Sequence, residues 1–259
     1  MAAYLKGAQM KNHFKSIYPI VTCKLLLDKG MFTYRMYYGE KIAVPIYAWL
    51  IKGDEEPILV DTGCSLEEML KYSYLSAGGE KGPPIEDSLQ KMGVSAGDIK
   101  TIVITHLHAD HVLNAEKFPY ARVIVQKEDL KFARNPHPLF TKSYHRQLFE
   151  GLNLETISGN TEVVPGVEVF LTPGHSPGCQ SVSVTTTRGK AVITGFCCID
   201  ENFGEGGDIV PGIHTDLYKA YDSVTKTREI ADIILPLHGK HVQSVESVPQ
   251  QSDLHERMG

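Results

Sequence analysis

The chain has 259 residues, of which 42% are hydrophobic and 22% are charged, as in an ordinary globular protein with a substantial core. Its formal net charge of −5 provides no overall basic surface for nucleic acid or an anionic membrane. No apolar run approaches the roughly 18–20 residues of a membrane-spanning helix. We therefore expect a single domain over residues 1–259 that binds neither nucleic acid nor membrane.

The five cysteines form no CxxC pair, and their odd number leaves no complete disulfide framework. Lysines interrupt the first fifteen residues, so no signal-peptide core is predicted there. Reduced thiols without a secretion signal predict a cytoplasmic protein. At the margins of the domain we expect an N-terminal extension over residues 1–16 and a polar tail over residues 242–259.

Short β-branched runs, bounded by glycine, proline or charged residues, predict strands. Helical patterns lie between some of them, and the first of these begins at a serine cap, Ser65. Because the strands come in groups, the pattern favours sheets packed between helices in one α/β domain. Strands are expected at 42–51, 57–63, 101–105, 121–125, 167–172, 181–185, 190–194 and 232–236, and helices at 65–75, 126–133 and 216–231.

Residues 64–95 join an early strand to the strand expected at 101–105. Their second half is rich in glycine and proline and is the most loop-like stretch inside the domain. Long connections of this kind often serve as lids over a site. We predict a lid or a surface excursion here.

The stretch HLHADH, residues 106–111, gathers three histidines and a carboxylate directly after the apolar run TIVIT. Residues two apart in an extended chain point to the same side, so His106 and His108 can aim at one point. Asp110 and His111 follow in a turn and can face a second point nearby. Several costly polar groups at one buried strand end rarely arise by accident. Imidazole and carboxylate ligands suit zinc, iron or manganese, so this stretch predicts a metal site.

Further ligands are needed, because four in one loop cannot complete two coordination spheres. His175 and His238 each follow an expected strand, at 167–172 and 232–236. The repeated order of strand, turn and histidine predicts that both reach the same sheet edge. Asp61 also ends a strand, where it would either orient a ligating histidine by accepting its second N–H or cap the turn before Thr-Gly.

Four stretches together resemble the metallo-β-lactamase superfamily: VDTG (60–63), THLHADH (105–111), TPGHSPG (172–178) and LHG (237–239). The fold that this resemblance implies is a four-layered αβ/βα sandwich with a metal site between the sheet edges. It also implies two divalent transition-metal ions, zinc first and iron or manganese as alternatives. By the resemblance, His106, His108 and His175 hold one ion, and Asp110, His111 and His238 hold the other.

The chemistry implied is attack by a solvent hydroxide held between the two metals. Two cations lower the pKa of bound water and stabilise the developing oxyanion. Asp110 is the catalytic residue that the resemblance implies, as a relay of the proton to the leaving group.

One element departs from the family pattern. Binuclear members usually carry Thr-Gly-Asp after a later strand, and that aspartate bridges the metals. Here the sequence reads AVITGFCCIDENF, with Phe196 at the expected position and Asp200 four residues later. We expect Asp200 as the bridging ligand. The alternatives are a sulfur from Cys197 or Cys198, or no protein bridge, with both cysteines packed as small buried side chains.

The stretch PIYAWLIKGDEEPILVDTG (45–63) and the helical excursion after it look most like the N-acyl-homoserine lactonase branch. That likeness implies a small-molecule substrate, metal-dependent opening of a lactone or cleavage of an ester, and a homodimer. The branch commonly has a tyrosine three residues after the bridging aspartate to support the carbonyl oxygen, but counting from Phe196 reaches Ile199. The substitutes that the sequence offers are Tyr72, Tyr74, His214 and Tyr218.

Other activities of the superfamily remain as alternatives. A thioesterase of the hydroxyacylglutathione hydrolase kind lacks support because no C-terminal domain with a basic patch is evident. A periplasmic β-lactamase conflicts with the cytoplasmic interpretation. A di-iron oxidoreductase usually has a flavodoxin-like extension, and it has a carboxylate at the position where this chain has His108. Against a non-catalytic metal-binding module, Asp110 is present and the glycine-rich stretch 204–212 can border an open pocket.

Overall fold

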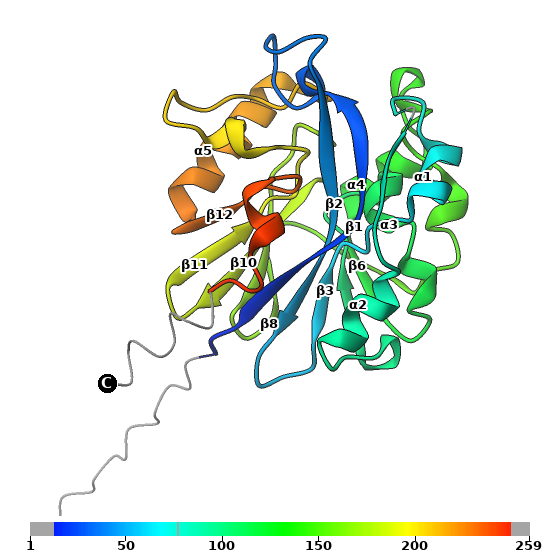
Figure 1. The fold of residues 1–259 in the computed structure, drawn as a ribbon, viewed down its shortest axis with the longest axis vertical. Coiled ribbons are helices and arrows are strands. Elements are labelled where there is room, and N and C mark those ends of the chain that lie inside the picture. The colour runs from blue at the N-terminus through cyan, green and yellow to red at the C-terminus, as the bar shows by residue number, and fades with distance from the viewer. Residues whose placement is uncertain (1–12, 77, 250–259) are drawn as a thin grey trace, which may run out of the picture.

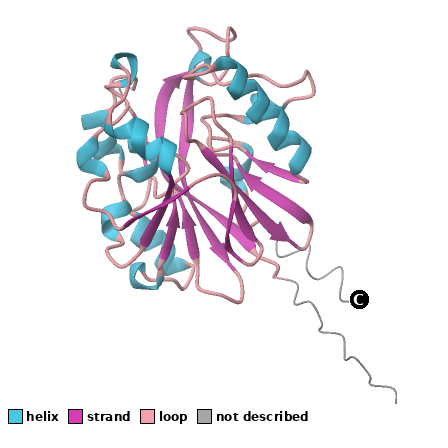
Figure 2. Ribbon diagram, turned by 180° about the vertical axis from the view of Figure 1, so that it is seen from behind, coloured by secondary structure: helices cyan, strands magenta, loops and turns pink. Residues whose placement is uncertain are grey.

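Two sheets pack face to face in the computed structural model, which describes residues 13–76 and 78–249 (Figure 1). The first sheet has seven strands in the order β4-β1-β2-β3-β5-β6-β7, and the second has five in the order β12-β11-β10-β9-β8. Helices cover the outer faces of the pair of sheets (Figure 2). The four-layered αβ/βα sandwich expected from the sequence is confirmed.

Neighbouring strands are mostly antiparallel, but β3, β5, β6 and β7 run parallel, as do β11 and β12. The first sheet contains β1 (Ser16–Asp28), β2 (Lys41–Lys52), β3 (Ile58–Val60), β4 (Gly79–Lys81), β5 (Thr101–Val103), β6 (Arg122–Gln126) and β7 (Leu154–Ile157). The second contains β8 (Thr161–Val164), β9 (Val167–Leu171), β10 (Gln180–Thr186), β11 (Gly189–Ile193) and β12 (Ile233–Leu235).

The helices are short except for the last. They are α1 (Leu66–Tyr72), α2 (Ile85–Lys91), α3 (Ala109–Val112), α4 (Lys127–Arg134) and α5 (Leu217–Ile230). Ser65 caps α1, as expected, because its Oγ accepts a hydrogen bond from the backbone N–H of Glu68 at 3.3 Å. Short 3-10 turns lie at Lys29–Met31, Ala96–Asp98, Ala115–Lys117, Pro138–Phe140, Arg146–Leu148, Asp200–Phe203 and His241–Ser244.

Alternating side chains of the strands divide the core into layers. In β6, Val123 and Val125 pack under the helices, whereas Ile124 lies between the two sheets. This is the two-residue period of a strand buried on both faces. Burying one such aliphatic side chain contributes roughly 1.5–3 kcal/mol. The layers together hold the strand ends in fixed positions.

The segment expected as a lid or excursion, 64–95, is only partly loop-like. Its second half contains β4 and α2, where the sequence predicted a loop. Ile85 and Leu89 of α2 are buried in the core on the helix side of the first sheet. This part of the segment therefore belongs to a core layer, because its apolar side chains are covered.

The structure describes the margins of the domain only in part. β1 begins at Ser16 and is the longest strand of the structure's described part, with 13 residues. In the tail, Val242 is buried and Val248 pairs with Ile17 of β1, so these two residues pack against the domain. The rest of the expected extension (1–12) and tail (250–259) lies outside the described residues. Over the described part of the chain, no helix combines the length and apolar character needed to cross a membrane.

Candidate metal centre

Five loops that leave the carboxyl ends of strands meet at one edge of the sandwich. β3 leads to Asp61 and β5 to the HLHADH stretch in the first sheet, and these two strands are parallel neighbours. In the second sheet β9 leads to His175, β11 to Cys197, and β12 to His238. Parallel neighbours end at the same edge, which is why residues far apart in sequence converge here.

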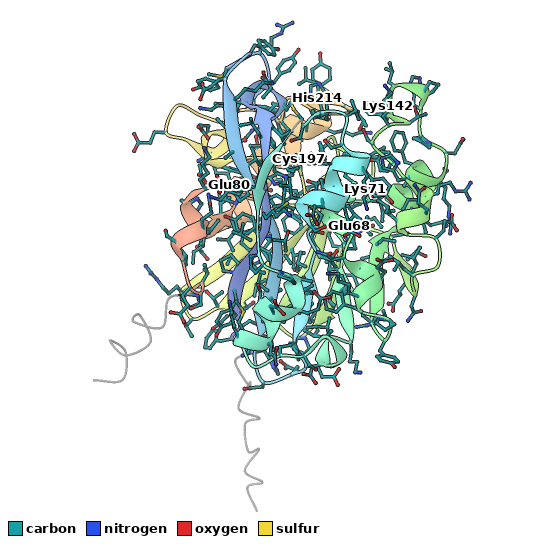
Figure 3. All side chains as sticks on the ribbon, turned by 45° about the vertical axis from the view of Figure 1, so that its right-hand side comes forward. Glu68, Lys71, Glu80, Lys142, Cys197 and His214 are labelled. Carbon is teal, nitrogen blue, oxygen red and sulfur yellow. The ribbon has the colours of Figure 1, made fainter. Side chains whose placement is uncertain are left out.

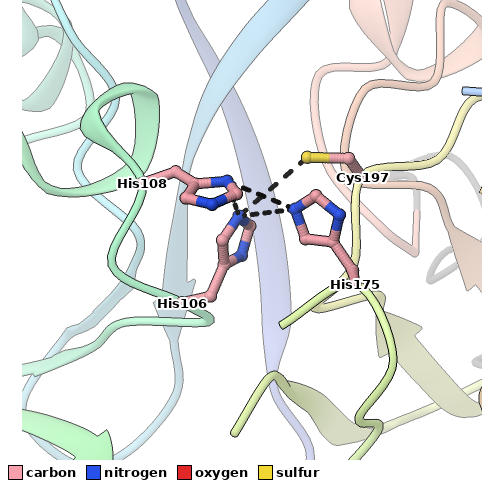
Figure 4. A group of neighbouring side chains, drawn as sticks. All are labelled: His106, His108, His175 and Cys197. Atoms are coloured by element: carbon pink, nitrogen blue, oxygen red, sulfur yellow. Dashed lines mark hydrogen bonds between the residues drawn. The ribbon is translucent and has the colours of Figure 1, made fainter. Parts of the chain in front are cut away.

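Three histidine nitrogens face one another in the first cluster (Figure 4). His106 Nε2 lies 3.1 Å from His108 Nδ1 and 3.1 Å from His175 Nε2, and the latter two are 3.3 Å apart. Two nitrogens bound to one tetrahedral zinc at roughly 2.0–2.1 Å are about 3.3–3.4 Å apart. The spacing of the three nitrogens therefore fits a shared cation.

Two of these three rings are held by a hydrogen bond from the nitrogen that faces away from the cluster. His106 Nδ1 donates to the carbonyl of Gly195 at 3.0 Å, and His175 Nδ1 donates to that of Ile213 at 2.8 Å. Because a carbonyl only accepts, these bonds fix the tautomer and leave Nε2 with its lone pair free. This is the usual support of a metal-binding histidine.

A second cluster adjoins the first and contains ligand atoms of His111, His238 and Cys197, all within 4.8 Å of one another. Asp110 Oδ2 lies 3.1 Å from His111 Nε2 and 3.8 Å from His238 Nε2. His111 Nε2 is buried and makes no hydrogen bond of acceptable geometry. A buried nitrogen left in this way is costly unless a ligand occupies the space it faces.

Asp61 lies behind His111, which corresponds to the first of the two roles that the sequence left open for it. It is fully buried, and its Oδ2 accepts the His111 Nδ1–H at 2.8 Å. Its carboxylate also accepts the backbone N–H of Thr105 at 2.7 Å and the Thr105 hydroxyl at 2.8 Å. With a φ of +54°, Asp61 adopts the left-handed conformation that non-glycine residues rarely take. The strained backbone of Asp61 thus occurs at a residue whose carboxylate orients His111.

Burial and neighbouring charges set the protonation of the ligands. Burial first, and then the adjacent histidines, lower the pKa of His106 well below its ordinary value. Burial likewise lowers the pKa of His175 and of His238 to about 4. These rings are neutral at neutral pH and keep a lone pair for a cation. Burial raises the pKa of the Cys197 thiol to about 11.

Two carboxylates, Asp110 and Asp61, adjoin the second cluster. Burial opposes the ionised form of Asp110, but His111 and His238 outweigh it, so the pKa of Asp110 is below its ordinary value. Burial also opposes the charged form of His111, but the carboxylates of Asp110 and Asp61 outweigh it and raise its pKa. Two carboxylates around these rings favour a cation at this position.

The structure does not bring Asp200 to the histidines. The Asp200 carboxylate pairs with the His241 ring and accepts the backbone N–H of Lys240 at 2.8 Å, and it belongs to neither ligand cluster. The prediction that Asp200 bridges the two metals does not agree with this arrangement. The cause is the path of the chain after β11, which buries Phe196 under α5 and turns Cys197 toward the histidines.

An apolar pocket opens over the two clusters and contains about 670 Å³ of space that continues into solvent. Asp110, His108, His175, Cys197 and His238 all contribute to its wall. The remaining wall is mainly hydrophobic, with a polar end that includes side chains of the connection between α4 and β7. Its apolar residues include Leu25, Leu27, Met31, Phe32, Met69, Leu75 and Ile213, and its further polar residues include Ser73, Lys142, Ser143 and His145.

The four substitutes for the missing tyrosine are divided by the structure. Tyr72 and Tyr74 line the pocket. His214 bonds the carbonyl of Pro211 and packs against a tyrosine ring, and Tyr218 is 83% exposed. Lys142 and His214 lie at the upper end of the view in Figure 3, above Cys197.

Sequence reasoning missed two parts of this wall. Leu25 and Leu27 belong to β1, whose run of Val, Ile and Leu was a usable strand signal. Lys142 and His145 lie in the connection between α4 and β7, where no spacing or motif marked them. Only the fold brings that connection to the pocket.

Comparison with known proteins agrees with the fold and the clusters. The pattern of the metallo-beta-lactamase superfamily matches residues 42–195. N-acyl homoserine lactonases from Bacillus cereus and Bacillus thuringiensis are 27% and 29% identical over 228 and 229 residues, covering 83% of this chain and 88% of each relative.

A solved structure of N-acyl homoserine lactone hydrolase, with the product N-hexanoyl-L-homoserine bound at the catalytic metal center, is also similar. It is 26% identical and superposes with a TM-score of 0.75, covering 88% of this chain and 95% of that one. The superfamily match includes β2 through the end of β11, with Asp61, the HLHADH stretch and His175. This chain belongs to the metallo-beta-lactamase superfamily.

Proposed function

We propose that this protein is a metal-dependent hydrolase that opens the ring of an N-acylated lactone. The observation that carries the proposal is the position of two adjoining ligand clusters at the wall of an apolar pocket. An acyl chain matches the hydrophobic wall, and a lactone carbonyl matches the polar end. The relatives named N-acyl homoserine lactonase support this substrate class.

We propose two zinc ions as the cofactor. His106, His108 and His175 would hold one, and Asp110, His111 and His238 the other, with Asp61 orienting His111. The fit rests on the spacing of the three nitrogens and on the buried His111 Nε2, which makes no hydrogen bond of acceptable geometry. Bound divalent ions supply a Lewis acid for the carbonyl and a lowered pKa for water.

The side chains supply positioning and proton transfer. The apolar wall holds the acyl chain and excludes water from it. Asp110 places a carboxylate on the pocket wall and would take the proton of the attacking water. As the water oxygen bonds to the carbonyl carbon, the ring C–O bond breaks and Asp110 returns the proton to the leaving oxygen. The product is an open-chain hydroxy acid.

A substrate panel on protein of measured metal content tests this function. N-acyl homoserine lactones of several chain lengths, a glutathione thioester and a chromogenic β-lactam would be compared under one metal condition. We expect the highest kcat/KM for the lactones and its loss with chelator. Faster turnover of the thioester would contradict the proposal and favour the hydroxyacylglutathione hydrolase class. Full lactone turnover with no bound metal would contradict the metal requirement.

Two broader properties belong to the same proposal. The cytoplasm is supported by five buried cysteines that form no disulfide, since a reducing compartment keeps thiols in this state. A homodimer is supported by the resemblance to the lactonase branch. Sedimentation of the purified, metal-loaded protein would measure it, and a monomer at all concentrations would contradict it.

A further inference from the structure

Among the described residues, Cys197 is the one residue common to both ligand clusters. Its Sγ lies within 4.8 Å of the ligand atoms of His106, His108 and His175, and within 4.8 Å of those of His111 and His238. We propose that the Cys197 thiolate is the ligand shared by two metal ions, at the place where the superfamily pattern has a carboxylate. The inference rests on the proposed function only in requiring that two ions bind.

The distances fit a coordinating sulfur. Cys197 Sγ lies 3.9 Å from His106 Nε2. A sulfur at roughly 2.3 Å and a nitrogen at roughly 2.1 Å from one tetrahedral zinc are about 3.6 Å apart. The two groups approach from opposite sides, with His106 and His108 on one loop and His175 and Cys197 facing them (Figure 4). The sulfur therefore lies where it completes the three-histidine set.

The backbone that carries Cys197 is tied to the same histidine. The Gly195 carbonyl accepts the His106 Nδ1–H at 3.0 Å, and the Gly195 N–H donates to Ser181 Oγ at 2.8 Å. A Cβ at residue 195 would lie 1.7 Å from the carbonyl oxygen of Gln180, so only glycine allows this close approach. The position of Cys197 is thus fixed by the strand end, not by a free loop.

The neighbouring candidates point elsewhere. Cys198 Sγ lies 3.0 Å from Thr194 Oγ1 and packs with Phe196 and Val224 against α5. Asp200 pairs with His241. From the loop after β11, only the Cys197 side chain reaches the two clusters. It takes the role that the sequence left open between a carboxylate, a sulfur and no bridge.

A thiolate changes the chemistry of the centre while keeping its charge. Like a carboxylate, it contributes one negative charge, but both ions share a single, softer atom. Thiolate ligands favour zinc over the hard cations manganese and magnesium. We therefore expect that added Mn²⁺ does not replace the two zinc ions bound to this protein.

X-ray absorption at the zinc edge tests the bridge directly in the wild-type protein loaded with two zinc ions per chain. If both ions share Cys197, the average is about one sulfur neighbour per zinc, whereas a sulfur on one ion alone gives about half of that. About one sulfur supports the proposal. Half, none, or saturation at a single zinc overturns it.

Two serine variants assign the sulfur. In Cys197→Ser we expect loss of the sulfur signal and at least about tenfold weaker binding of the second zinc, since even loss of an outer partner weakens metal binding this much. Cys198→Ser is the matched control, because its hydroxyl can keep the contact with Thr194. A sulfur signal that persists in Cys197→Ser, or that disappears in Cys198→Ser, overturns the assignment.

Two further measurements separate this proposal from the others. Thermal unfolding of the metal-free variants reports whether either substitution damages the fold itself. Lactone turnover measured on the same samples separates the bridge from the function. A two-zinc protein with one sulfur per zinc and no lactone turnover would support the bridging thiolate and contradict the proposed function. Lactone turnover by a two-zinc centre without sulfur would contradict the bridging thiolate and support the proposed function.

Discussion

At the scale of single residues, Asp61 ties the loop that carries the histidines to the end of β3. It accepts three hydrogen bonds, from the His111 ring and from the backbone and hydroxyl of Thr105. Asp61→Asn would keep the volume of the side chain but replace one acceptor oxygen by an NH₂ donor. Because the new group faces donors, the His111 ring loses its orientation, and we expect zinc affinity to fall by roughly 10–100-fold. Competition with a chromogenic chelator measures this affinity.

The control for Asp61→Asn is Asp98→Asn. Asp98 is an exposed aspartate that accepts hydrogen bonds from Ser95 in a surface turn. Asp98→Asn makes the same chemical change far from the two clusters, so zinc affinity should not change. Equal zinc affinities for both variants and the wild type would show that Asp61 caps its turn without orienting His111.

The residues of the site differed in how far the sequence could identify them. The five histidines and Asp110 are brought together as expected because their motifs directly follow strands, whose ends the sheet fixes. The loop after β11 was different, since the choice between Cys197 and Asp200 depends on which side chain faces inward. Burial of Phe196 under α5 decides this. No spacing within the loop reveals that contact.

At the scale of elements, every strand expected from the sequence is present, but β1, β4, β7 and β8 were not predicted. β1 contains Pro19 and Lys24, which interrupt the apolar alternation. Pairing with β2 on one side and β4 on the other outweighs these two interruptions of an otherwise usable strand signal. β7 and β8 are short and half polar, so only their neighbours in the sheets define them as strands.

The missed strand β1 supplies one wall of the pocket, which gives a test at this scale. Leu27 is 6% exposed and lines the pocket. Leu27→Trp should shorten the apolar space, and we expect KM for a long-chain lactone to rise on the order of tenfold relative to a short-chain one. Steady-state kinetics with decanoyl and butanoyl homoserine lactones measure the ratio.

The neighbouring residue on β1 is a matched control. Leu26 is 46% exposed and does not belong to the wall of the pocket. Leu26→Trp adds the same bulk to the opposite face of the same strand, so the ratio of the two KM values should stay at the wild-type level. A selectivity that shifts equally in both variants would place the acyl chain outside this pocket.

At the scale of the whole molecule, the metal clusters join the two sheets. His106, His108, Asp110 and His111 follow β5 of the first sheet, whereas His175, Cys197 and His238 follow strands of the second. An ion bound between them is a cross-link that the unfolded chain does not form in the same way. The second connection between the two sheets is the apolar core that they share, which includes Trp49. Bound metal should therefore stabilise the sandwich as a unit.

Removal of the metal tests this cross-link. One ion at 100 times its Kd adds about 2.7 kcal/mol to the free energy of unfolding, and a protein of this size then gains roughly 5–10 °C in Tm. We expect chelator to lower Tm by at least this amount, as measured by calorimetry on protein of known metal content. His175→Ala lacks one ligand from the second sheet, so chelator should shift its Tm by much less. If Tm stays constant while the zinc of the wild type is fully removed, the ions do not connect the sheets, and packing between them carries the stability alone.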